Sequence, residues 1–129
     1  MTESAVTIVV EALRLFEKRD AEAVAARFAP AGVFIDPHYP PPIGPEISGR
    51  EAIRDALAGM FQVLQQPGFT VRHAFGGTNN PAMAAVEVDT RHVLADGSGV
   101  EFPQVFVGEV DSEGLLLRLE SYTPHPPAG

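Results

Sequence analysis

The period of the hydrophobic pattern changes near residue 66, and this change most constrains the fold. Before it, apolar residues recur at helical spacing in three segments, at about 4–19, 21–28 and 49–65. After it they alternate with polar residues, as in half-buried strands, at about 69–75, 83–94, 100–110 and 115–122. Short turns join these strands, which predicts an antiparallel sheet. The sequence therefore predicts an α+β domain in which three N-terminal helices pack against a sheet.

The segment 33–50 separates the first two helices from the third and contains the strongest candidate for chemistry. The apolar run 33–35 predicts a short buried strand that ends at Asp36, just before Pro37 forces the backbone into an extended conformation. The prolines from Pro37 to Pro45 predict a stiff, non-helical segment that covers the domain, called the cover segment below. A capping box at 48–51 predicts the start of the third helix. An acid at this place is a candidate functional residue, and an ordinary turn aspartate before proline is the alternative.

Composition excludes several classes of function. The 129 residues suffice for one domain, expected at 1–123, with a flexible tail at 124–129. The net charge is -8 and the basic residues are scattered, so nucleic acid and anionic membrane surfaces are not expected partners. Without cysteine there is no zinc–thiolate site, and the four histidines are not closely paired, so neither a metal site nor a cofactor is expected.

The apolar runs also bear on the location of the protein. None is long enough to span a bilayer, and the acidic N-terminus lacks the basic start of a signal peptide. We therefore expect a cytoplasmic protein.

The order of elements, the segment 20–37 and the sequence Ser-Gly-Arg-Glu-Ala-Ile at 48–53 resemble the nuclear transport factor 2-like superfamily. SnoaL-like proteins, ketosteroid isomerases and limonene epoxide hydrolases belong to it, and the resemblance covers about 6–122. It implies a cone-shaped, cystatin-like domain, in which a curved sheet wraps around the helices and an interior pocket opens at one end. It also implies pairing of subunits through their sheets, and the many β-branched residues on the strands independently favour a homodimer.

The resemblance to ketosteroid isomerases implies a role for Asp36, which matches the position of their general base. The oxyanion hole of those enzymes, a tyrosine and a protonated aspartate, falls at Ala12 and Phe106, so both donors are missing. Tyr39, Tyr122 or a carboxylic acid kept neutral by burial remain as donors. The leading hypothesis is a cofactor-independent acid–base enzyme, an isomerase or cyclase, that acts on a small and mostly apolar molecule.

The resemblance to limonene epoxide hydrolases implies a second hypothesis, which depends on the strand at 83–94. One aspartate of their Asp-Arg-Asp arrangement matches Asp89, while Glu87 occupies the arginine position and Arg91 could replace that arginine. The alignment sends all three side chains inward, so that Asp36, Asp89 and Arg91 could open an epoxide. In the alternative orientation this charged face is solvated, and the apolar side chains of the strand pack inward.

The remaining site predictions concern the pocket wall. Besides the candidate catalytic residues Asp36, Glu87 and Asp89, the predicted substrate-binding residues are Tyr39, Leu57, Phe61, His73, Arg91, Gln104, Phe106 and Tyr122. His73 is expected in the wall or the core rather than in catalysis. Tyr39 lies in the cover segment, where it could orient a substrate, but an exposed loop position is the favoured interpretation. A third hypothesis is a non-catalytic ligand-binding or assembly domain, because one fold hosts both kinds of function.

Overall fold

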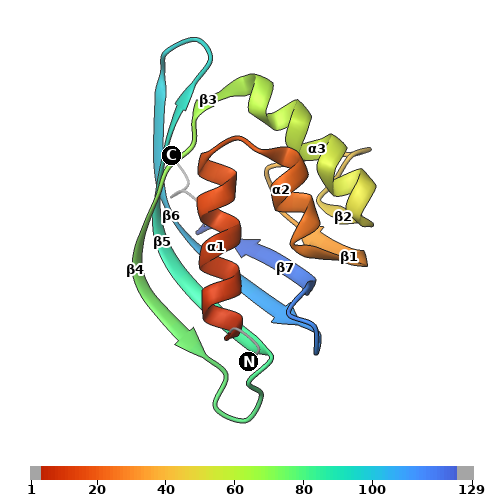
Figure 1. The fold of residues 1–129 in the computed structure, drawn as a ribbon. Helices are drawn as coiled ribbons and strands as arrows, with labels where there is room; N and C mark the ends of the chain where they lie inside the picture. Colours follow the sequence, from red (N-terminus) through yellow and green to blue (C-terminus); the bar gives the residue numbers. More distant parts are fainter. Residues whose placement is uncertain (1–3, 125–129) are drawn as a thin grey trace.

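A computed structural model describes residues 4–124 (Figure 1). The helices are α1 (Ala5–Glu17), α2 (Ala21–Ala26) and α3 (Arg50–Val63). The strands are β1 (Phe28–Ile35), β2 (Glu46–Ser48), β3 (Leu64–Gln66), β4 (Phe69–Gly76), β5 (Met83–Leu94), β6 (Gly99–Val110) and β7 (Leu116–Tyr122). Apart from Pro124, the tail predicted at 124–129 lies outside the described residues.

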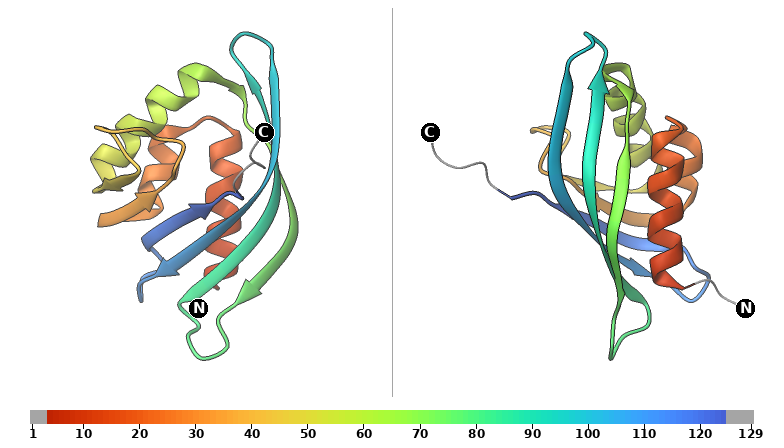
Figure 2. Two further views of the ribbon diagram at one scale, coloured as in Figure 1. Left: turned by 180° about the vertical axis from the view of Figure 1, so that it is seen from behind. Right: turned by 90° about the vertical axis from the view of Figure 1, so that its left-hand side faces the viewer.

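The seven strands form one sheet in the order β2-β1-β7-β6-β5-β3, with β4 also paired to β5. All strand pairs are antiparallel except β1 and β7, which are parallel, so the prediction of a wholly antiparallel sheet is wrong at this pair. The sheet is strongly curved, and the helices lie against its concave face (Figure 2). The predicted α+β architecture, a curved sheet wrapped around three helices, is confirmed.

Helix α1 lies directly on the inner face of the sheet. Its buried residues include Ile8, Val9 and Leu13, which lie on one face of the helix. A Cβ atom added to Gly108 of β6 would lie 2.5 Å from Val9 Cγ2, so only glycine permits this close approach. The helix is capped by Ser4, whose hydroxyl accepts a hydrogen bond from the Thr7 N–H at 3.1 Å.

Two helix ends differ from the prediction because tertiary contacts override local propensity. The second helix ends at Ala26, and Phe28 begins β1 instead, where it pairs with β7. The third helix ends at Val63, because 64–66 pair with β5 as strand β3. The predicted capping box does not form: the N-cap of α3 is Gly49, and no side chain caps the helix.

Candidate functional site

A pocket of about 190 Å³ lies between the helices and the concave face of the sheet. Its wall is mostly apolar, with contributions from α1, α3 and the inner faces of several strands. Its polar residues are Asp36, His38, Tyr39, His92 and Gln104. This volume is comparable with the roughly 150 Å³ of an apolar cavity that takes up benzene, so the pocket fits a compact molecule.

Asp36 follows the last residue of β1 and is only 8% exposed. Its backbone N–H donates to the Pro45 carbonyl at 2.9 Å, which ties the start of the cover segment to the segment's far end. Its Oδ1 accepts from the backbone N–H of His38 at 2.9 Å and contacts His38 Nδ1 at 2.7 Å. These bonds orient the carboxylate through Oδ1, and Oδ2 has no hydrogen bond within residues 4–124.

His38 lines the pocket and lies between this carboxylate and solvent. An ionised carboxylate can only accept hydrogen bonds, so Nδ1 of His38 is the donor in their contact. The hydrogen bond to Asp36 raises the pKa of His38, although partial burial opposes the shift. The ring is half-exposed and packs on Phe102, with 5.2 Å between ring centroids. His38 can therefore exchange protons with solvent while it holds Asp36 in place.

His92 was missed by the sequence analysis. It lies on β5, is 8% exposed and lines the pocket. Its Nδ1 accepts a hydrogen bond from the Gly68 backbone N–H at 3.1 Å, which places the proton of the neutral ring on Nε2. Burial, and then the nearby His38, lower the pKa of His92. The structure thus holds a neutral imidazole in the pocket.

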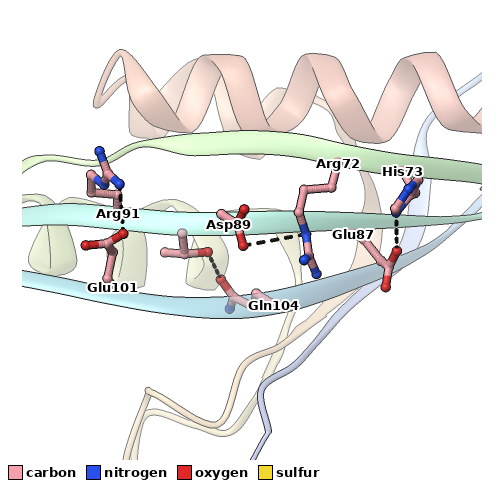
Figure 3. Close-up of polar contacts among 8 residues, drawn as sticks. Arg72, His73, Glu87, Asp89, Arg91, Glu101 and Gln104 are labelled. Atoms are coloured by element: carbon pink, nitrogen blue, oxygen red, sulfur yellow. Dashed lines mark hydrogen bonds and ion pairs between the residues drawn. The ribbon is translucent and has the colours of Figure 1, made fainter.

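Gln104 is held by a buried hydrogen bond on the inner face of the sheet. The Thr90 hydroxyl donates to Gln104 Oε1 at 2.7 Å, and both residues are buried (Figure 3). With its oxygen occupied, the side-chain amide can offer its N–H groups to the pocket that it lines. A second N–H donor is therefore present at this site.

Tyr39 lies in the cover segment but is buried, so the expectation that it is an exposed loop residue is wrong. Its side chain lines the pocket, is 5% exposed and packs edge-on against Phe34, with 5.9 Å between ring centroids. Its hydroxyl is buried without a hydrogen-bond partner within residues 4–124. Burial, with a smaller effect from Asp36, raises the pKa of Tyr39, so the hydroxyl stays protonated. A buried polar group without a partner is costly, which suggests that a ligand or water completes it.

The predicted inward orientation of Glu87, Asp89 and Arg91 is wrong. The three side chains lie on the outer face of the sheet, where they contact His73 at 2.8 Å, Arg72 at 3.5 Å and Glu101 at 2.8 Å, respectively (Figure 3). The inner face of β5 instead carries Val86, Val88 and Thr90, all of them fully buried.

This reversal has a simple cause and a wide consequence. Side chains alternate across a strand, so a wrong phase moves every residue to the opposite face. Asp89 and Arg91 therefore do not meet Asp36, and the epoxide-opening arrangement is not assembled. If the buried face of β5 is assigned from the apolar Val86 and Val88, the alternation of the strand also places His92 on that face. The sequence therefore contained a signal that could have identified His92 as a pocket residue.

The other predicted wall residues divide into three groups. Leu57, Gln104 and Phe106 line the pocket together with Asp36 and Tyr39. Phe61 is buried beside the wall, packed against Phe16 at 4.9 Å between ring centroids. His73 and Tyr122 are exposed, Tyr122 at 50%, so their predicted places in the pocket are wrong. Both lie on the outer face, His73 beside Glu87 and Tyr122 opposite Val105.

Two further features concern metals and membranes. Within residues 4–124, no three histidine, aspartate or glutamate side chains gather so that they could hold a metal ion. In the same part of the chain, no helix has both the length and the apolar character needed to cross a bilayer.

Solved structures share this fold at low sequence identity. A Mycobacterium tuberculosis protein, crystallised with estradiol-17β-hemisuccinate, is 22% identical with a TM-score of 0.79, over 93% of this chain and 94% of that one. The epoxide hydrolase/cyclase-like enzyme SalBIII of salinomycin pyran-ring formation is 18% identical, with a TM-score of 0.77 over 93% and 90% of the two chains. A putative isomerase from Bacillus subtilis is also 18% identical, with a TM-score of 0.77 over 95% and 90%.

Comparison by sequence gives the family. No curated protein sequence matches the chain. The family model described as the SnoaL-like domain matches residues 9–119, from within α1 to near the end of β7. Because this match spans most of the chain and the solved structures share its curved sheet, the chain belongs to the SnoaL-like domain family, with the nuclear transport factor 2-like, ketosteroid isomerase-like fold.

Proposed function

We propose that the protein is a cofactor-independent acid–base enzyme, an isomerase or cyclase, that acts on a small and mostly apolar molecule with Asp36 as general base. One observation carries this proposal: a nearly buried carboxylate, with one oxygen free of hydrogen bonds in residues 4–124, lies in the wall of an otherwise mostly apolar pocket. A positioned carboxylate in a dry site is a typical arrangement for proton abstraction.

The chemistry follows from the free oxygen of Asp36. Oδ2 removes a proton from a carbon next to a carbonyl group, and the electron pair of that C–H bond moves into the carbonyl to give an enolate. Return of the proton to another carbon of the conjugated system completes an isomerisation. In a cyclase, the enolate carbon instead attacks a second carbonyl carbon of the same molecule, the π electrons of that C=O bond move to its oxygen, and this oxygen takes up the proton held by Asp36. Both reactions require a donor that stabilises the enolate oxygen.

A non-catalytic ligand-binding domain is the second candidate. The Mycobacterium tuberculosis protein of the same fold was crystallised with a steroid derivative, estradiol-17β-hemisuccinate, so this architecture can hold a molecule with a large apolar ring system. Ligand binding alone would use the same pocket and would make Asp36 a turn and contact residue. Proton exchange separates the two candidates.

The test follows hydrogen and oxygen isotopes. Small cyclic enones are incubated with the wild type in deuterated water, and deuterium at the carbons next to the carbonyl is measured by mass spectrometry. We expect the enzyme to catalyse incorporation of deuterium into the enones. In a second assay, a terpene epoxide is incubated with the enzyme in ¹⁸O-labelled water, and we expect no labelled oxygen in the product. If no enone exchanges while an apolar ligand raises the melting temperature, the protein is the binding domain and the enzymatic proposal fails.

We also propose a homodimer that covers the outer face of the sheet. The three helices pack on the inner face, and the outer face exposes Phe75 at 55% and Tyr122 at 50%. Large exposed side chains on an uncovered sheet face are typical of an interface. Sedimentation velocity should give a dimer for the wild type and a monomer for Phe75→Glu or Tyr122→Glu. A wild-type monomer at all concentrations would contradict the proposal.

A further inference from the structure

We propose that His92 is the oxyanion donor of this pocket, and that its Nε2–H binds the carbonyl oxygen of a neutral, one-ring ketone or enone. This inference rests on the proposed function, because it identifies the group that stabilises the enolate formed when Asp36 removes a proton. It also fills the gap left by Ala12 and Phe106, the positions at which the related isomerases carry their donors.

The geometry of His92 fixes which nitrogen can donate. The backbone N–H of Gly68, at 3.1 Å, occupies the Nδ1 lone pair, so the neutral ring has its proton on Nε2. Phe69 packs on the ring with 5.3 Å between centroids, and Phe102 with 6.3 Å. The imidazole is therefore held in one tautomer and one orientation, and a fixed donor needs little reorganisation during reaction.

The position of His92 relative to the base supports the same role. Phe102 packs against both His92 and His38, and His38 holds Asp36. The carboxylate and the imidazole therefore belong to the same part of the pocket. The charges of His38 and Asp36 act on the pKa of His92, in opposite directions, while burial lowers it. A neutral imidazole that polarises a carbonyl is an established catalytic device.

The chemistry of the wall defines the ligand class. The pocket offers N–H and O–H donors from His92, Gln104 and Tyr39, and one carboxylate from Asp36. An anionic ligand would meet that carboxylate, and a cationic ligand would lose hydration in a mostly apolar wall. A neutral molecule with a carbonyl acceptor satisfies these groups. The volume of about 190 Å³ is below the roughly 300 Å³ at which pockets for drug-sized ligands begin, so a single ring fits.

The test measures binding and carbonyl polarisation rather than turnover. The probe is cyclohex-2-enone labelled with ¹³C at the carbonyl, with cyclohexene as the ring that lacks an oxygen. In the wild type we expect the enone to bind more tightly than cyclohexene. Its carbonyl resonance should move downfield from the value in an apolar solvent, as hydrogen bonding to oxygen requires.

The variants separate a ligand contact from a structural role. In His92→Asn, the new Oδ1 lies as many bonds from the backbone as Nδ1 and can still accept from Gly68, whereas the Nε2 donor is lost. We expect roughly tenfold weaker binding and loss of most of the downfield shift. His73→Asn, the same change on the outer face, should match the wild type. The amide exchange rate of Gly68 reports whether the structural hydrogen bond persists.

The outcomes for this inference and for the proposed function are distinguishable. Asp36→Asn should abolish proton exchange but retain the His92-dependent carbonyl shift. If exchange depends on Asp36 while the shift is unchanged in His92→Asn, the proposed function stands and His92 is not the donor. A shift that disappears instead in Tyr39→Phe assigns the donor to Tyr39 and overturns the inference. Failure of the enone to bind overturns the assigned ligand class.

Discussion

Within residues 4–124, two histidine–carboxylate pairs have almost the same distance between their atoms, one on each side of the sheet. His38 and Asp36 lie 2.7 Å apart in the pocket, and His73 and Glu87 lie 2.8 Å apart on the outer face. Their surroundings differ. The Asp36 side chain is 12% exposed and the Glu87 side chain 35%, and His73 is more exposed than His38.

The comparison shows that the distance within a pair does not identify a site. Within a single subunit, water screens the outer pair, and exposed ion pairs contribute little to stability or reactivity. The inner pair lies in a mostly apolar wall, where hydrogen bonds and charges act more strongly. Four predictions test whether this contrast between the two faces holds.

The largest expected effect is on catalysis. Asp36→Asn should reduce enone isotope exchange at least roughly 100-fold, because the amide preserves shape but cannot take a proton. Glu87→Gln, the matched change in the outer pair, should leave exchange unchanged. Mass spectrometry on both purified variants measures the rates. Equal losses in the two variants would remove the functional contrast between the faces.

The next effect concerns how closely the inner face of the sheet packs against α1. Gly108→Ala should destabilise the protein by about 1–3 kcal/mol, because the new Cβ would lie 2.5 Å from Val9 Cγ2. Gly76→Ala on β4 meets nothing within 4 Å and should be neutral or stabilise by up to about 1 kcal/mol. Urea unfolding measures both. A neutral Gly108→Ala would mean that α1 does not lie so close to the sheet.

A smaller effect is expected on the pH dependence of the free energy of unfolding, to which the pocket histidines His38 and His92 contribute with opposite signs. The pKa of His38 is raised, so its contribution to stability is full below pH about 6.5 and is lost as pH rises through the raised pKa. The pKa of His92 is lowered, so the fold loses stability as pH falls below about 6.5 through that pKa.

Unfolding from pH 5 to 8.5 should reveal both signs. The stability difference between wild type and His38→Gln should shrink as pH rises. The wild type should lose stability as pH falls below about 6.5, and in His92→Asn the share of this loss that comes from protonation of His92 should be absent. Parallel pH profiles for wild type and both variants would show that neither histidine is coupled to folding.

The smallest effect is expected for the outer charges. Arg91→Ala and Asp89→Asn should each change the free energy of unfolding by less than about 0.5 kcal/mol and leave isotope exchange unchanged, because these side chains form exposed ion pairs. Calorimetry and the exchange assay measure the two properties. A severe loss of isotope exchange in Arg91→Ala would contradict the outward placement of this side chain.

The fold and part of the pocket could be predicted from the sequence. The helical stripe of α1 and the alternation along β5 have strong periods, so these elements were found with bounds close to those observed. Asp36, Leu57, Gln104 and Phe106 were placed in the wall, and the structure brings them together. The family match later confirmed the resemblance from which their roles had been inferred.

Other features depended on contacts that no local pattern encodes. Residues 64–66 continue a helical pattern but pair with β5, and β1 lies parallel to β7 across most of the sequence. The hydroxyl of Tyr39 and the imidazole of His92 enter the pocket only because the cover segment folds inward and Gly68 fixes the ring. Such pairings join residues far apart in the chain.

The sequence by itself determined the class of fold, the location of its elements and the end-of-strand position of Asp36, because these follow from periodicity and from proline chemistry. Only the tertiary structure decided which face of β5 lines the pocket. Alternation specifies two faces but does not say which one the helices cover. That choice buried Val86, Val88 and His92 and left Glu87, Asp89 and Arg91 in water, because burying unpaired charges costs far more than burying apolar side chains gains.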